Sequence, residues 1–415
     1  MPNMLSIFLR IGTLGCKFLL IILMAKFLSV NDFGLYGLLT VTVGYSIYLV
    51  GFDFYNYTTR ELVSLSPEKW GRIFKAQGML TLILYFLFIP VCSLFFVFGF
   101  MPSYLFVWFV GLLVVEHVCQ EITRILISAS FHVAASAVIF LRTGAWALVC
   151  SLLMILFPGL RVLELVLGGW IVGGVMACAL GVVCLSGLKI SGWSDRVDME
   201  IIKFGIKVSL PLLISTLAMR AIFTVDRYLI DAYGNSETLA AYVLFAGVAT
   251  TLMSLLDAAV YFPSYPKLIK FHSERGVKEF MNIFRRMLVL ATFIAVAFMA
   301  FNVFAIEYVL KWLGKAIYLE RLEMFYWVLA GMVIYSLSMV PHYGLYAKKL
   351  DEKIIFCHCF SLIIFILSGV IFVDKGGASS IPMALCITFS FMLVCKSFFF
   401  AKACFSRCES VRIND

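Results

Sequence analysis

The feature that most constrains the fold is a series of long apolar segments that occupies almost the whole chain. A helix of about 20 mainly apolar residues crosses the roughly 30 Å core of a bilayer. Twelve segments of that size lie at about 5–28, 34–56, 76–98, 104–125, 133–157, 163–186, 208–232, 239–262, 287–310, 323–346, 354–373 and 381–402. The sequence therefore predicts an all-α polytopic membrane protein with twelve transmembrane helices.

Composition and motifs exclude several other classes. The chain is 63% hydrophobic and 14% charged, whereas about a quarter of a soluble domain is charged. A transmembrane β-barrel would show alternating segments of about 10 residues instead of long apolar runs. The sequence has no G-x-x-x-x-G-K-[ST], H-E-x-x-H or G-x-S-x-G motif, and the connections are too short for a soluble catalytic domain. We therefore expect that the protein is not an enzyme and that it binds no cofactor, no metal ion and no nucleic acid.

The basic residues predict an orientation. If the N-terminus faces the cytoplasm, the loops on that side hold most of the 33 Lys and Arg residues. The opposite loops hold only Arg161, Lys311, Lys315, Arg321 and Lys375. Because Lys and Arg are enriched in cytoplasmic loops, we expect both termini to be cytoplasmic. The net charge of +9 follows from this topology.

A polar stretch near the middle of the chain divides the spans six and six. We expect an N-terminal six-helix bundle over 1–188, a cytoplasmic linker over 189–207, a C-terminal six-helix bundle over 208–402 and a cytoplasmic tail over 403–415. Similar patterns, "SVNDFGLYGLLTVTV" from Ser29 and "GNSETLAAYVLFAGVA" from Gly234, follow the first and seventh segments. They favour parallel repeats around a central cavity.

Basic residues at mid-span predict the substrate site. Charged side chains within a membrane span normally face a bundle interior or a water-filled cavity. Lys17, Arg142 and Arg220 lie deep in their segments, and Arg227 shares a helix face with Arg220. Guanidinium and ammonium groups replace the hydration of a phosphate. We therefore expect these four residues to bind an anionic cargo.

Other intramembrane charges have different expected roles. Glu116, Asp226 and Asp257 are candidate proton or sodium sites, and Asp226 is expected to turn toward a neighbouring helix. Arg227 is expected to pair with Asp231, four residues later. Lys26 and Lys396 are expected to snorkel to the interface. The alternative is that such charges pair across helices and fix packing, which we favour at span ends, as at Asp53.

Five further motifs are "LSVNDFGLYGLL", "TTREL" at Thr58–Leu62, "SLPLLIST" at Ser209–Thr216, "VDRYLI…LAAYVLFA" and "SYPKL" at Ser264–Leu268. Together they resemble the O-antigen flippases, polysaccharide-transport members of the multidrug/oligosaccharidyl-lipid/polysaccharide exporter superfamily. The resemblance implies a multi-pass protein of the bacterial inner membrane in lipopolysaccharide biosynthesis. Its implied partners are an undecaprenyl-diphosphate-linked oligosaccharide, membrane lipid, and polysaccharide polymerase and chain-length proteins. It also implies an acidic–basic pair at Asp226 and Arg227.

The resulting function hypothesis is a flippase that moves the O-antigen repeat unit from the cytoplasmic to the periplasmic leaflet by alternating access. One alternative is an ion-coupled multidrug or organic-cation exporter of the same superfamily, in which mid-cavity acids are expected. Another is a membrane polymerase or ligase, which would need larger extracytoplasmic loops than this chain has. The basic character of Lys17 and Arg220 favours the flippase.

Overall fold

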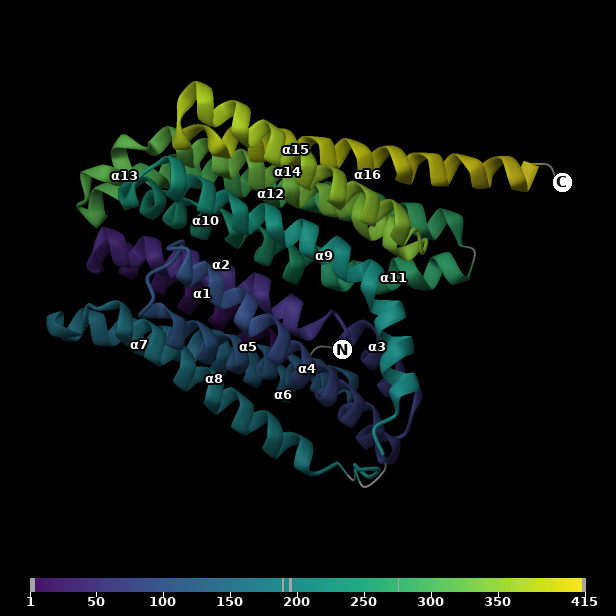
Figure 1. Cartoon of the computed structure of the whole chain (residues 1–415). Coiled ribbons are helices and arrows are strands. Elements are labelled where there is room, and N and C mark those ends of the chain that lie inside the picture. The colour runs from purple at the N-terminus through teal and green to yellow at the C-terminus, as the bar shows by residue number, and fades with distance from the viewer. Residues whose placement is uncertain (1–3, 189, 194–195, 275, 413–415) are drawn as a thin grey trace. The chain divides into compact units, whose positions relative to one another are not determined.

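The computed structural model describes residues 4–188, 190–193, 196–274 and 276–412, and these residues contain helices and no strand (Figure 1). Twelve helical stretches in the described part are long and apolar enough to cross a membrane. The predicted all-α fold with twelve candidate spans is therefore confirmed. The chain divides into an N-terminal unit, Met1–Arg220, and a C-terminal unit, Ala221–Asp415.

The N-terminal unit begins with helices that the predicted spans locate closely. Its elements are α1 (Met4–Phe27), α2 (Val30–Gly51), α3 (Tyr55–Ser64), η1 (Pro67–Lys69), α4 (Trp70–Val97), α5 (Leu105–Ser128), α6 (His132–Phe140), η2 (Leu141–Ala145), α7 (Trp146–Leu156), η3 (Pro158–Leu160) and α8 (Leu163–Ser186). α5 packs against α8, and α1 packs against α6, η2 and α7. Apolar residues of α5, α6 and α8 form a buried cluster around Leu126 and Val138.

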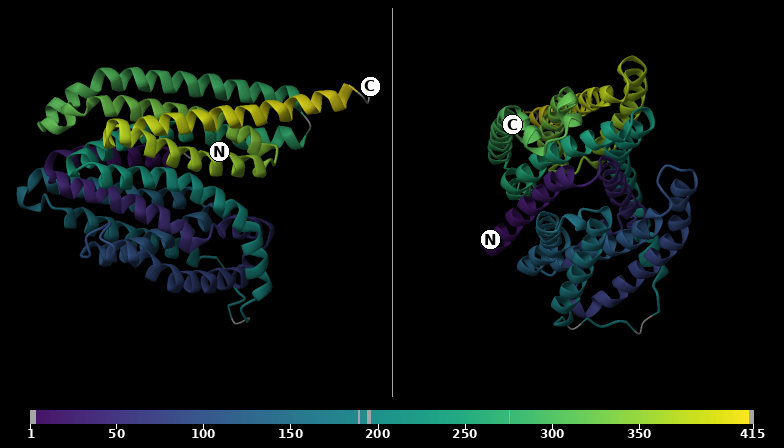
Figure 2. Two further views of the ribbon diagram at one scale, coloured as in Figure 1. Left: turned by 45° about the horizontal axis from the view of Figure 1, so that its top comes forward. Right: turned by 90° about the vertical axis from the view of Figure 1, so that its left-hand side faces the viewer.

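The two units share α9 (Met199–Tyr233), which starts inside the stretch expected as a linker and continues through the seventh predicted span. The C-terminal unit continues with α10 (Ser236–Leu256), η4 (Asp257–Tyr261), α11 (Phe262–Ser273), α12 (Val277–Leu313), α13 (Ala316–Glu320), α14 (Leu322–Ala347), α15 (Asp351–Gly376), η5 (Ala378–Ser380) and α16 (Ile381–Arg412). Figure 2 shows α12, α14 and α16 of this unit running side by side, in agreement with their contacts. Their apolar faces enclose a core that includes Tyr261, Val340 and Phe400.

The two sequence patterns that suggested a repeat begin with the same type of helix cap. At the start of α2, the Ser29 hydroxyl accepts a hydrogen bond from the Asp32 backbone N–H at 3.0 Å. At the start of α10, the Asn235 side-chain oxygen accepts one from the Thr238 backbone N–H at 2.8 Å. A side-chain acceptor satisfies an N–H group that has no partner within the helix. Both turns therefore start a helix by the same chemistry.

Two π-helical segments interrupt the long helices, and both contain a predicted site residue. η2 includes Arg142, and η4 begins at Asp257. A π-helical turn admits one extra residue and is frequent at functional sites. At η2, a Cβ on Gly144 would lie 3.0 Å from the Thr13 Cα atom. Glycine at this position lets α1 approach η2 closely and brings Lys17 toward Arg142.

Candidate functional site

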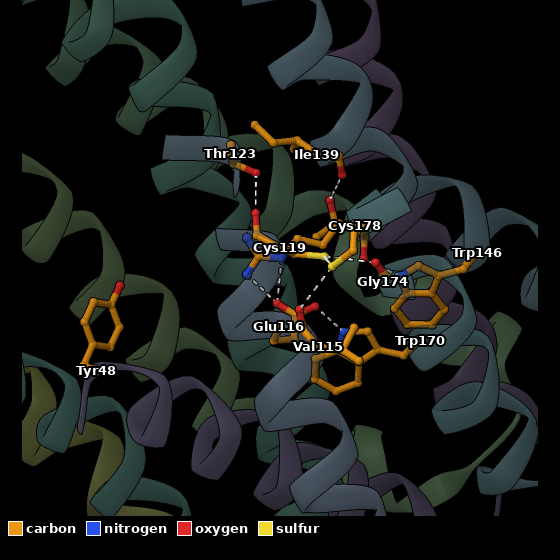
Figure 3. Close-up of polar contacts among 12 residues, drawn as sticks. Tyr48, Val115, Glu116, Cys119, Thr123, Ile139, Trp146, Trp170, Gly174 and Cys178 are labelled. Atoms are coloured by element: carbon orange, nitrogen blue, oxygen red, sulfur yellow. Dashed lines mark hydrogen bonds and ion pairs between the residues drawn. The ribbon is translucent and has the colours of Figure 1, made fainter. Parts of the chain in front are cut away.

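A group of buried polar contacts in the N-terminal unit is centred on Glu116 in α5 (Figure 3). Arg142 donates to the Glu116 Oε2 atom from Nε at 2.7 Å and also from Nη2. The Trp170 indole N–H of α8 donates to the Oε1 atom at 2.6 Å. Glu116 is only 5% exposed, and both of its oxygens have donors. The expected cation Arg142 and the expected ion-coupling acid Glu116 are thus joined in one buried ion pair.

Aromatic rings and thiols surround this ion pair. Trp146 stacks on Trp170 with ring centroids 6.0 Å apart and an interplanar angle of 10°. On the other side, the Cys119 and Cys178 sulfur atoms lie 3.2 Å apart (Figure 3). The low dielectric of such surroundings strengthens the attraction between Arg142 and Glu116. The pair therefore ties η2, α5 and α8 together.

Lys17 adds a second positive charge beside the pair. It lies on α1, is exposed, and is within electrostatic reach of Glu116 and Arg142. Among the residues that the structure describes, it makes no hydrogen bond or ion pair at contact distance. Since Glu116 supplies one negative charge and Lys17 and Arg142 supply two positive charges, the three side chains carry a net charge of +1.

Arg220, the last residue of the N-terminal unit, is also an exposed cation. Its guanidinium donates to the Tyr48 hydroxyl of α2 at 2.8 Å and lies 4.9 Å from the centroid of that ring. Both of these contacts are made to an uncharged side chain.

In the C-terminal unit, Arg227 and Asp226 contact each other directly. The Arg227 Nη1 atom lies 3.5 Å from the Asp226 Oδ1 atom and donates to the Phe223 carbonyl at 2.6 Å. Tyr242 of α10 donates its hydroxyl to Asp226. The expected turn of Asp226 toward a neighbouring helix is confirmed. The expected pair of Arg227 with Asp231 is wrong: Arg227 pairs with Asp226, which is only 1% exposed and requires donors, whereas Asp231 is exposed.

Asp257 differs from the other two acids proposed for ion coupling. It is partly exposed at the start of η4 and has no hydrogen-bond partner within the described ranges. Tyr261 and Tyr343 lie within its electrostatic reach. Their ring centroids are 5.2 Å apart, and Tyr265 stacks on Tyr343 at 5.7 Å. Asp257 is thus a carboxylate beside an aromatic cluster.

Lys396 corrects the expectation that it snorkels to the interface. The side chain is 0% exposed in α16, and its Nζ atom has no hydrogen-bond partner in the part of the chain that the structure describes. The stacked rings of His342 and His358, with centroids 5.7 Å apart, come from the adjacent helices α14 and α15. Helix periodicity placed Lys396 near a span end, but it could not show that α14 and α15 both cover this position.

The comparisons with known proteins identify the fold. No protein-family model and no curated protein matches the sequence. Among solved structures, an inward-facing multidrug resistance MATE family transporter of the MOP superfamily is 13% identical, with a TM-score of 0.77 over 96% of this chain and 98% of that one. The outward-facing form of such a transporter is 16% identical, with a TM-score of 0.62 over 97% and 95% of the two chains.

A further similar structure is a MOP superfamily transporter from Pyrococcus furiosus, described as having a binding pocket of reverse polarity that suggests a different function. It is 15% identical, with a TM-score of 0.62 over 97% of this chain and 96% of that one. At these identities the matches show a shared fold. The chain therefore has the fold of the MATE transporters, and what it binds must be argued from its own residues.

Proposed function

We propose that this protein is a flippase that moves an undecaprenyl-diphosphate-linked oligosaccharide across the bacterial inner membrane by alternating access. The observation that carries the proposal is the net positive group of Lys17, Arg142 and Glu116, with Lys17 exposed. A diphosphate loses its hydration when it leaves water, and positively charged donors replace that hydration. The fold supports transport because its structural neighbours include inward- and outward-facing transporters.

Each basic residue has a different role in this proposal. Lys17 and Arg220 contact the phosphate oxygens directly, since both are exposed. Arg142 raises the local positive potential while its ion pair with Glu116 holds α5, η2 and α8 in place. The proposed orientation has both termini in the cytoplasm, so the cargo moves toward the periplasmic leaflet. Polysaccharide polymerase and chain-length proteins would receive the product there.

A cellular measurement tests the role of the two exposed cations. Lys17→Ala and Arg220→Ala are expected to reduce surface polysaccharide in a bacterial strain that depends on this protein, at unchanged membrane levels. Lys203→Ala is a matched control, because Lys203 is an exposed lysine at the start of α9 whose partner is Glu200. Normal polysaccharide with both cation variants would refute the proposed binding role.

One observation favours a second candidate function. Asp257 and the stacked Tyr265 and Tyr343 rings combine a carboxylate with aromatic faces, and organic cations bind to such groups. An ion-coupled exporter of organic cations would therefore use the C-terminal unit. Efflux of a cationic dye that is lost in Asp257→Asn and kept in Lys17→Ala would support the exporter over the flippase.

A further inference from the structure

The charged and hydroxyl side chains of α1 lie on one narrow face of an otherwise apolar helix. Between Met4 and Ala25 they are Ser6, Arg10, Thr13 and Lys17. These residues follow one another at steps of four, three and four positions. At about 100° per residue, all four fall within an arc of about 60°. We call these four residues the α1 polar stripe.

The α1 polar stripe runs along the edge of the face that α1 buries in the N-terminal unit. Its hydroxyl residues, Ser6 and Thr13, are buried. Its two cations, Arg10 and Lys17, are exposed. A Cβ on Gly144 would lie 3.0 Å from the Thr13 Cα atom, so the stripe borders η2. The hydroxyls therefore lie on the packed side of the stripe, and the positive charges lie on its accessible side.

Arg10 and Lys17 occupy equivalent positions two turns apart. A rise of 1.5 Å per residue separates their Cα atoms by about 10 Å along the helix axis. Neither side chain makes a hydrogen bond or an ion pair at contact distance with the residues that the structure describes. Charged residues within membrane helices normally pair or face a polar space. Arg10 therefore has the same character as Lys17, to which the proposed function assigns the cargo.

Snorkelling to lipid headgroups does not by itself explain where Arg10 lies. The large exposed apolar side chains Phe8, Ile11 and Phe18 lie on another side of α1, about 80–160° from Arg10 around the helix. An arginine that only snorkelled could occupy any exposed position near the helix end. Arg10 instead lies within about 20° of Lys17 around the helix. This alignment indicates a ligand that the two residues share.

We propose that Arg10 is a further cargo-binding residue, which binds the diphosphate first and passes it along the α1 polar stripe to Lys17. This inference rests on the proposed function, because it assigns Lys17 to the same headgroup and uses the proposed cytoplasmic N-terminus. Both side chains carry charged N–H donors that suit phosphate oxygens. A separation of about 10 Å is close to the Debye length in 0.1 M salt, so Lys17 still attracts an anion that Arg10 holds.

Transport by the purified full chain in proteoliposomes tests this order of binding. The probe is a fluorescent farnesyl-diphosphate-linked saccharide, and its rate of movement is measured against its mole fraction in the membrane. Arg10→Ala should need about tenfold more probe for the half-maximal rate, because one charge-assisted contact is lost when the cargo first binds. Its maximal rate should change much less. Lys17→Ala should lower the maximal rate, since Lys17 acts after this first contact.

Matched variants separate binding by Arg10 from a general effect of charge. Arg10→Lys keeps the positive charge and should reach its half-maximal rate at less probe than Arg10→Ala. The double variant Arg10→Ala, Ile11→Arg moves the guanidinium by about 100°, to another exposed position, and should behave as Arg10→Ala. Full recovery in the double variant would overturn the assignment to the stripe. Arg10→Gln gives a second neutral variant if Arg10→Ala does not fold.

The salt dependence of the rate gives a second readout. At a low mole fraction of probe, added salt should slow the wild type more than Arg10→Ala, because a charge that first attracts a ligand is screened. Identical kinetics of the two proteins, or an equal loss in Arg10→Ala at every mole fraction, would overturn the first-binding role and leave the proposed function intact. Failure of the wild type to move the probe at any mole fraction would instead overturn the proposed function.

Discussion

Replacement of Glu116 tests how the intramembrane charges are arranged in the N-terminal unit. Glu116→Gln removes the carboxylate that accepts hydrogen bonds from Arg142 and Trp170. The positive charges of Arg142 and Lys17 then lack the negative charge of Glu116 beside them. Removing one partner of a buried ion pair costs about 3–5 kcal/mol. Because the Arg142 side chain is 17% exposed, we expect the lower end, about 3 kcal/mol of unfolding free energy.

A double-mutant cycle separates the interaction energy between Glu116 and Arg142 from the other effects of each substitution. Arg142→Met should also destabilise the protein, because it leaves Glu116 charged and buried. The double variant Glu116→Gln, Arg142→Met should recover part of the loss, with a coupling of about 1–3 kcal/mol for residues in contact. Reversible denaturation in detergent, followed by tryptophan fluorescence, measures all four proteins. Additive losses would refute a direct interaction between the two side chains.

Three further substitutions have expected effects on stability, measured in the same denaturation assay. Lys396→Met should raise the unfolding free energy by about 1–3 kcal/mol, because it removes a buried amine that has no partner among the described residues; a loss of stability would show that the amine is satisfied. Tyr242→Phe should lower the unfolding free energy by about 1.5–3 kcal/mol, because Asp226 loses a hydrogen-bond donor. Tyr308→Phe, at an exposed position, should leave the unfolding free energy unchanged. Equal effects of the two substitutions would contradict this prediction. Asp53→Asn should stabilise the protein near neutral pH. Burial raises the pKa of Asp53 in the folded state, so the wild type loses stability as the pH rises from the unfolded-state pKa through the folded-state pKa. The benefit of Asp53→Asn should vanish in acid, and a benefit independent of pH would contradict it.

The spans could be predicted from the sequence because each is a continuous apolar run whose length matches the bilayer. The helix starts at Ser29 and Asn235 also follow from local sequence, since a cap needs only residues within one turn. Even the orientation of Asp226 away from Arg220 follows from the 100° step between successive helix residues.

Partners on different helices could not be predicted in this way. Periodicity gives the face on which Arg142 lies but not that Glu116, on another helix, occupies the opposing face. The burial of Lys396 depends on two neighbouring helices at once. The burial of Asp53 could not be predicted either, because it depends on a left-handed turn at Phe52, for which the sequence lacks the usual glycine or asparagine.

The most direct test of the proposed function is transport by the purified protein in proteoliposomes. The cargo is a fluorescent prenyl-diphosphate-linked saccharide, and a cationic dye serves as the competing cargo. We predict that the wild type moves the diphosphate lipid between leaflets and that Lys17→Ala and Arg220→Ala do not, while Lys203→Ala does. Movement of the dye without movement of the diphosphate lipid would contradict an anionic cargo and support an exporter of organic cations.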